Sequence, residues 1–121
     1  MIGYVDEAMR SLLQIMIRGK PAGESTPVTV WVDTAFNGCL VVSKQLIAEL
    51  ALQKEAETEA ILADGSVVVL DSYVGYVEWC GKIIRSQVIA NEGMLPLLGT
   101  ELLVGCVLVV DYRNMELTVN T

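Results

Sequence analysis

The chain of 121 residues contains no histidine. Histidine is the commonest general base, the usual partner of a nucleophilic serine or cysteine, and a frequent ligand of zinc. Its absence excludes Ser-His and Cys-His nucleophile pairs, most zinc sites and histidine acid-base catalysis. Any chemistry must therefore come from carboxylates, hydroxyls, lysines or the backbone.

Cysteine is scarce as well, with three residues far apart in the chain: Cys39, Cys80 and Cys106. An odd number of cysteines without a CxxC pair argues against a disulfide framework and against a zinc site. Each cysteine stands in an apolar, strand-like stretch, so we expect buried, reduced thiols that act as small core residues.

The chain also lacks an apolar run of the roughly 18 residues that span a bilayer. Its first residues place acidic side chains before an apolar stretch and have no basic leader, unlike a secretory signal. The net charge is −7 and the eight basic residues are scattered, so phosphate backbones would be repelled. We expect a cytoplasmic protein that binds neither membrane nor nucleic acid.

What the chain has in abundance is apolar residues, which make up 53% of it. A chain of this length can bury a core without disulfides or metal, and we expect a single domain over residues 1–121. Short apolar runs separated by turn residues predict a mostly β structure.

Three hairpins are expected along the chain. The first joins residues 11–19 to 28–32 across a loop rich in turn-forming residues. The second is long and protruding, and turns at Asp64-Gly65, which is typical of a type I′ turn. The last turns at Arg113-Asn114, near the end of the chain.

One or two short helices complete the expected structure. Ser43 is placed as the N-cap of an amphipathic helix with Leu46, Ile47 and Leu50 at helical spacing. The segment 94–105, MLPLLGTELLVG, is expected to form an apolar turn that leads into a short helical turn.

The stretch VTVWVDTAFNGCLVV places one carboxylate, Asp33, at the end of an apolar run. A carboxylate at an inward-facing strand end loses solvation, so it needs partners, a shared proton or a chemical role. Taken alone, Asp33 also fits a local turn in which its carboxylate accepts nearby N–H groups. Asp111 ends another apolar run, but a polar turn follows it, and we expect a surface residue there.

Four segments occur in a suggestive order: VDTAFNGCLVV, LADGS, PLLGTELL and LVVDY. On these segments, from about Leu12 to Val119, the chain resembles the retropepsin-like aspartic peptidases, particularly the small bacterial ones. The resemblance implies a closed β-barrel with one or two short helices. It also implies an aspartyl protease, a hydrolase of peptide bonds that needs no metal or organic cofactor.

The resemblance also implies roles for individual residues. Asp33 would be the catalytic carboxylate, Thr34 the hydroxyl that locks two such turns together, and Ala35 the third residue of the motif. Leu98-Gly99 would pack beside that turn, and a flap would lie over the substrate. The residues implied around the substrate are Phe36, Ala63, Asp64, Gly65, Ser66, Leu98 and Gly99.

Aspartic peptidase chemistry requires two carboxylates roughly 3 Å apart that share a proton, one acting as base and the other as acid. This chain supplies one such turn, so catalysis would require a C2 homodimer in which each subunit contributes Asp33. The partner would be a peptide or protein substrate, bound as an added strand between the flap and the cleft.

Ala35 stands where the family usually has glycine, and Phe36 replaces a common small residue. Alanine keeps the backbone N–H, but its methyl group adds bulk and disfavours positive φ. An alternative is therefore a non-catalytic dimer of the same fold that serves as a peptide-binding or assembly module. An unrelated small β-barrel also fits, with Thr34, Asp64-Gly65 and Gly99 as ordinary strand and turn residues.

Overall fold

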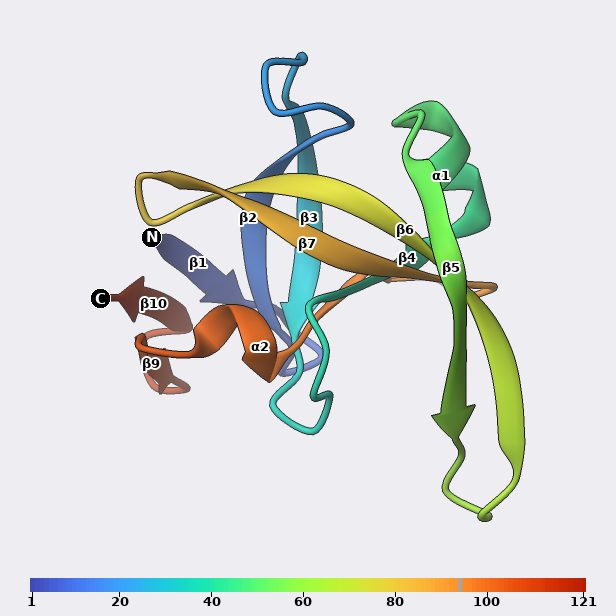
Figure 1. Cartoon of the computed structure of the whole chain (residues 1–121). Helices are drawn as coiled ribbons and strands as arrows, with labels where there is room; N and C mark the ends of the chain where they lie inside the picture. The colour runs from blue at the N-terminus through green and yellow to red at the C-terminus, as the bar shows by residue number, and fades with distance from the viewer. Residues whose placement is uncertain (94) are drawn as a thin grey trace.

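The alternating apolar segments form ten strands and two short helices in a computed structural model that describes residues 1–93 and 95–121 (Figure 1). The strands are β1 Ile2–Val5, β2 Ser11–Arg18, β3 Thr26–Val32, β4 Leu40–Ser43, β5 Gln53–Ile61, β6 Val67–Trp79, β7 Lys82–Asn91, β8 Leu97–Leu98, β9 Val107–Asp111 and β10 Glu116–Asn120. The helices are α1 Lys44–Glu49 and α2 Thr100–Leu103. The mostly β prediction is confirmed.

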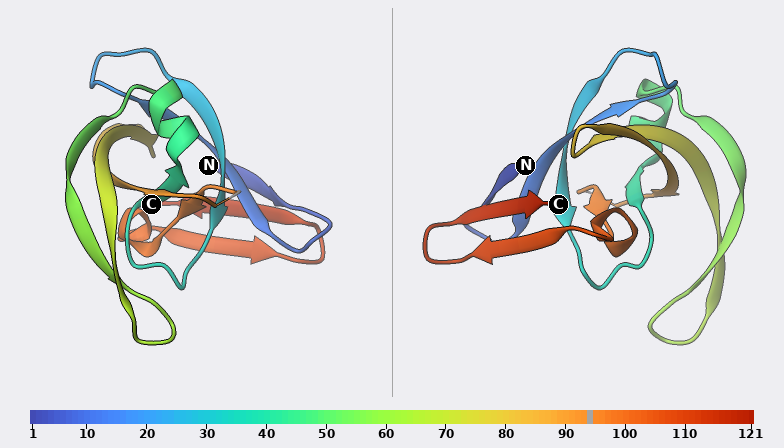
Figure 2. Two further views of the ribbon diagram at one scale, coloured as in Figure 1. Left: turned by 90° about the vertical axis from the view of Figure 1, so that its right-hand side faces the viewer. Right: turned by 60° about the vertical axis from the view of Figure 1, so that its left-hand side comes forward.

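All strands belong to one sheet in the order β5-β6-β7-β4-β8-β3-β2-β1-β10-β9. Because β6 also pairs with β2, the strands from β6 to β2 in this order close into a ring. Beyond the ring, β5 pairs with β6 at one end of the strand order and forms a long hairpin with it. At the other end, β1, β10 and β9 form a projecting sheet (Figure 2).

The core fills the inside of the ring with side chains from alternate strand positions. On β2 and β3 every second residue is buried, as period-2 alternation requires. The buried residues of these two strands include Leu13, Ile15, Ile17, Val28, Val30 and Val32. Full burial of such a side chain contributes about 1.5–3 kcal/mol. The burial of Val32 fixes the end of β3, where Asp33 follows.

The predicted helix after Ser43 is confirmed. The Ser43 hydroxyl accepts a hydrogen bond from the Leu46 N–H at 3.2 Å, and Ile47 is buried against the core. The first turn carries no acidic residue, so the cap supplies the N-terminal stabilisation. Among the described residues, neither helix is long and apolar enough to cross a membrane.

The β5–β6 hairpin has a different turn from the predicted type I′. The Gly65 N–H donates to the Leu62 carbonyl and the Leu62 N–H donates to the Ser66 carbonyl. Of the loop residues, Gly65 has positive φ, at 86°, whereas a type I′ turn needs positive φ at two central residues. The prediction of a type I′ turn is wrong: a type I turn is followed by a left-handed glycine in a three-residue loop.

The cysteine prediction is confirmed for one residue of three. Cys39 is buried, but Cys80 and Cys106 are half-buried and lie outside the strands. Cys80 and Gly81 form the tight β6–β7 turn, both with positive φ, and Cys106 precedes β9. All three thiols are free. Cys80 and Cys106 are therefore not strand core residues, because the chain reverses at or beside them.

Strand β1 was not expected from the sequence. Its four residues pair with β2 on one side and with β10 on the other. Most of its stability comes from partners elsewhere in the chain, which local propensity does not reveal. Hairpins β2–β3 and β9–β10 match the prediction. Met94, the first residue of the predicted apolar turn, lies outside the described residues.

Candidate active site

Asp33 directly follows β3, and strand alternation decides which side of the sheet it faces. Trp31 is exposed, Val32 is buried and Asp33 is half-exposed. The Asp33 N–H donates to the Leu98 carbonyl at 2.9 Å, which extends the parallel pairing of β3 with β8 by one residue. The backbone of Asp33 is therefore held by a strand that lies more than sixty residues later in the sequence.

The turn after Asp33 is organised by its own carboxylate. The Ala35 N–H donates to Asp33 Oδ1 at 3.0 Å, and the Phe36 N–H donates to the Asp33 carbonyl at 3.1 Å. These bonds form the local turn that the sequence also predicted for Asp33, in which its carboxylate accepts nearby N–H groups. Ala35 is not among the residues with positive φ, so its methyl group introduces no backbone strain here.

Leu98-Gly99 and the start of α2 hold the far side of this turn. The Gly99 N–H donates to the Cys39 carbonyl at 2.9 Å, and the Thr100 N–H donates to the Phe36 carbonyl at 2.8 Å. The next amide, that of Glu101, donates to the Gly38 carbonyl at 3.2 Å. Three successive backbone amides thus donate hydrogen bonds to loop carbonyls that would otherwise bind water.

Gly99 is required for this close approach because of space and not because of its backbone conformation. Its φ is −100°, which any residue can adopt. A Cβ at Gly99 would lie 2.6 Å from the Phe36 carbonyl oxygen and closer still to that of Gly38. Both neighbours are backbone atoms that cannot rotate away. The structure places Leu98 and Gly99 beside the Asp33 turn.

Two of the residues that the resemblance places around the substrate, Leu98 and Phe36, instead support the Asp33 turn within this chain. The Leu98 side chain is completely buried in the core, so its part in the site is its backbone carbonyl. The Phe36 ring is half-buried and covers Gly38 and Gly99, where an added Cβ would collide with it. Thr34, in contrast, is exposed at the tip of the turn.

The residues that the resemblance places in a flap lie on a separate hairpin. Ala63, Asp64, Gly65 and Ser66 are all exposed, and the tip of their hairpin lies at the same end of the molecule as the Asp33 turn (Figures 1 and 2). Asp64 Oδ1 accepts hydrogen bonds from the Ser66 N–H at 2.9 Å and the Ser66 hydroxyl at 2.6 Å. These bonds, the hydroxyl first, hold the pKa of Asp64 below its ordinary value.

Two features of the site were missed in the sequence. Gly38 supplies a carbonyl to α2 and room for the Phe36 ring, and a glycine two positions after an aromatic residue was the available signal. Arg10 lies over the exposed ring of Trp31, two residues before Asp33, with 5.9 Å from its guanidinium carbon to the ring centroid. Asp6 holds Arg10 by an ion pair of 2.7 Å. This second arrangement joins two separate segments, so no local pattern indicated it.

No family model matches the chain, and no curated protein matches it. Solved structures do match. A retropepsin-like aspartic protease from Rickettsia conorii superimposes with a TM-score of 0.65 at 15% identity, over 99% of this chain and 89% of the other. EIAV protease in complex with an inhibitor superimposes with a TM-score of 0.62 at 19% identity, over 86% of this chain and 96% of the other.

The fold is retropepsin-like. At these identities the likeness establishes the fold alone. Proteolytic activity is a property of the two neighbouring proteins. In this fold Asp33, Ala35, Phe36, Leu98 and Gly99 form one hydrogen-bonded unit, and the β5–β6 turn lies on a separate hairpin.

Gly99→Ala tests the close approach of the two segments. We expect a loss of about 3 kcal/mol in the free energy of unfolding, because a methyl group would overlap backbone atoms that cannot move aside. Urea denaturation measures it. Gly81→Ala is the control: its site is open but has φ of 80°, so it should lose only about 1 kcal/mol. Equal losses in the two variants would contradict the steric argument.

The flap turn should depend on pH through Asp64. Because the pKa of Asp64 is lowered in the folded chain, its stabilisation is complete above the ordinary value of 3.8 and is lost as the pH falls through the lower folded value. Amide hydrogen exchange at Leu62 and Gly65 should therefore accelerate in strong acid relative to the intrinsic rate. Asp64→Asn does not titrate and should remove this pH dependence; an unchanged profile would exclude Asp64 as its source.

Proposed function

We propose that the protein is a homodimeric aspartic endopeptidase. The observation that carries the proposal is the position of Asp33: it ends a core strand and lies in a turn braced by β8 and α2 within a retropepsin-like fold. This bracing limits the movement of the carboxylate, as a catalytic group requires. No metal or organic cofactor enters the proposed chemistry.

The proposed chemistry uses Asp33 from each of two subunits. Two carboxylates roughly 3 Å apart cannot both ionise readily, so the pair holds one proton. The ionised carboxylate takes a proton from a water molecule, whose oxygen attacks the peptide carbonyl, while the protonated partner donates to the carbonyl oxygen. Transfer of a proton to the leaving amine then breaks the C–N bond.

The projecting sheet offers a surface for the second copy. Its register places Ile2, Thr118 and Val109 side by side across β1, β10 and β9. The neighbouring apolar residues on this face are also exposed, so the face carries Ile2, Tyr4, Val107 and Val109. Strand β9 ends the strand order of the sheet and leaves one edge unpaired. The register also places the polar residues Glu116, Asp111 and Asn120 on this face, so it is mixed. Its exposed apolar side chains beside a free edge favour association with a like surface.

The substrate would be an extended peptide under the flap. The flap hairpin exposes Ile61, Leu62, Val67 and Val69 around its polar tip. Main-chain hydrogen bonds to an added strand would supply affinity, and apolar side chains of the hairpin would select apolar residues of the peptide. The preferred substrate class is therefore a peptide or unfolded protein segment with large apolar side chains.

Asp33→Asn tests the catalytic assignment. The amide cannot act as a base, so peptide cleavage should fall by at least about a thousandfold while the dimer persists. The assay measures cleavage of an apolar peptide library in mildly acidic buffer, where the pair shares one proton. Glu92→Gln, at an exposed carboxylate that pairs with Lys44 on the surface, is the control and should retain activity. Unchanged cleavage in Asp33→Asn would reject the catalytic role.

Val109→Asp tests the dimer. A carboxylate on the apolar face of an edge strand costs little in the monomer but opposes self-association. Sedimentation should show a monomer, and peptide cleavage should be lost with the dimer. Ile83→Asp, an exposed apolar site on β7, should leave both intact. Retained dimer and activity in Val109→Asp would remove this face from the proposal.

The second candidate function is a non-catalytic peptide-binding or assembly dimer, and Ala35 is the residue that favours it. Its exposed methyl group lies two residues from Asp33 in the turn where the family usually has glycine. A dimer that binds apolar peptides but cleaves none of them, with or without Asp33, would select this function.

A further inference from the structure

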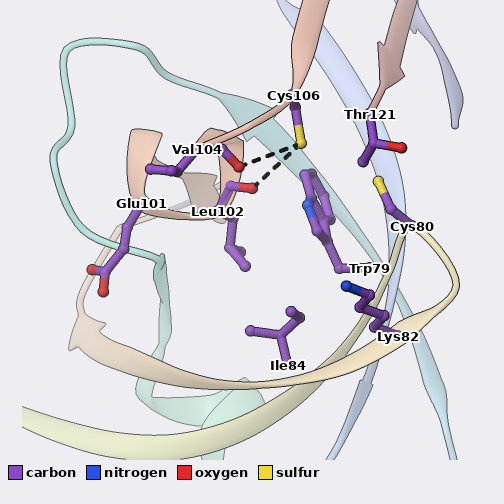
Figure 3. Close-up of a pocket in the computed structure, with 9 residues that line it drawn as sticks. All are labelled: Trp79, Cys80, Lys82, Ile84, Glu101, Leu102, Val104, Cys106 and Thr121. Atoms are coloured by element: carbon purple, nitrogen blue, oxygen red, sulfur yellow. Dashed lines mark hydrogen bonds between the residues drawn. The ribbon is translucent and has the colours of Figure 1, made fainter.

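Three sulfur atoms gather at the end of the molecule where both chain termini lie. Met1 precedes β1, Cys80 lies in the β6–β7 turn and Cys106 precedes β9. The Cys80 Sγ lies 4.0 Å from the Met1 Sδ. Cys80 and Cys106 line the same cavity of about 300 Å³, and Figure 3 shows their thiols pointing toward one another above the Trp79 ring.

The two thiols lack strong partners of their own. The Cys106 Sγ approaches the carbonyl oxygens of Leu102 and Val104 at 3.9 Å, at the weak limit of a thiol hydrogen bond. Burial, followed by the neighbouring Cys106, raises the pKa of Cys80 above its ordinary value.

The spacing of the Cys80 and Met1 sulfur atoms fits one edge of a trigonal metal site. With metal–sulfur bonds of about 2.3 Å, three sulfur ligands in a plane around one ion lie about 4.0 Å apart. The distance between Cys80 and Met1 already has this value. The three ligands come from three elements that only the folded chain brings together.

We propose that Met1, Cys80 and Cys106 form a binding site for one Cu(I) ion. Two thiolates and a thioether are soft ligands of the kind that Cu(I) prefers. A tetrahedral zinc site needs a fourth ligand, and the described residues contain no group of three His, Cys, Asp or Glu side chains that could hold a metal. This site is independent of the proposed peptidase activity.

The binding step balances in protons, charge and oxidation state. One Cu(I) ion replaces the two thiol protons, which pass to solvent, and the resulting site carries a net charge of −1 without any change of oxidation state. Lys82 and Glu101 both line the same cavity, one with a positive and the other with a negative side chain (Figure 3).

Trp79 provides a reporter beside the thiols. It is 4% exposed, and its indole N–H has no hydrogen-bond partner among the described residues. The other tryptophan, Trp31, lies on β3 and is 38% exposed. In a Trp31→Phe background, the fluorescence therefore reports on the cavity alone.

The test is anaerobic titration of the folded, reduced protein with Cu(I) against a chromogenic Cu(I) chelator. We expect one ion per chain, quenching of Trp79 and sulfur-only coordination in X-ray absorption spectra. Cys80→Ser and Cys106→Ser should each weaken affinity by at least about a hundredfold. Cys39→Ser is the matched control, because Cys39 is buried elsewhere in the core, and it should bind like the parent protein.

Two results would overturn the proposal. One is parent-like affinity in both Cys80→Ser and Cys106→Ser. The other is a stoichiometric ion that is lost in Cys39→Ser but retained in the other two variants. Thermal unfolding of each variant without metal shows whether it is folded, and Cys106→Ala replaces any serine variant that is not. Peptide cleavage is not a readout, so the result is separate from that of Asp33→Asn.

Discussion

The parallel contact between the end of β3 and β8 is the constraint on which the rest of the site depends. It places the Asp33 amide on the Leu98 carbonyl and brings Gly99 so close that no side chain fits between the two segments. The amides that follow Leu98 then satisfy the carbonyls of the turn. A carboxylate at a strand end is ordinary; one whose turn is pinned by a second segment has a defined position.

The same contact explains why alanine is accommodated at position 35. The turn takes its shape from the Asp33 carboxylate and from the α2 amides, and Ala35 contributes its N–H in a conformation that alanine adopts without strain. The glycines that matter for space are Gly38 and Gly99, which accept the Phe36 ring. The position where the resemblance predicts glycine is therefore Ala35, whereas the positions that require glycine for space are Gly38 and Gly99.

Helix α2 links the two regions that we propose to be functional. At its start, Thr100 and Glu101 donate to the Asp33 turn, and at its end Leu102 and Val104 contact the Cys106 thiol. The helix has only four residues, so both sets of contacts share one short rigid segment. An ion at Cys106 would thus be bound within a few residues of the backbone that supports Asp33.

By itself, the sequence determined the local structure. Alternation predicted β2, β3 and the last hairpin, Ser43 predicted the start of α1, and Asp33 was marked by its place after an apolar run. These features depend on side chains a few residues apart. The ordered segments also indicated the retropepsin-like fold, which the solved structures support.

Only the tertiary structure decided the long-range contacts. Strand β1 exists through partners from both ends of the chain, Leu98 acts through its carbonyl, and Cys80 and Cys106 line one cavity although 26 positions separate them. The flap turn also differed from its prediction, because Asp-Gly is compatible with two loop types and the length of the loop selects between them. Pairing register and close packing arise between distant segments, and residue types within one segment do not specify them.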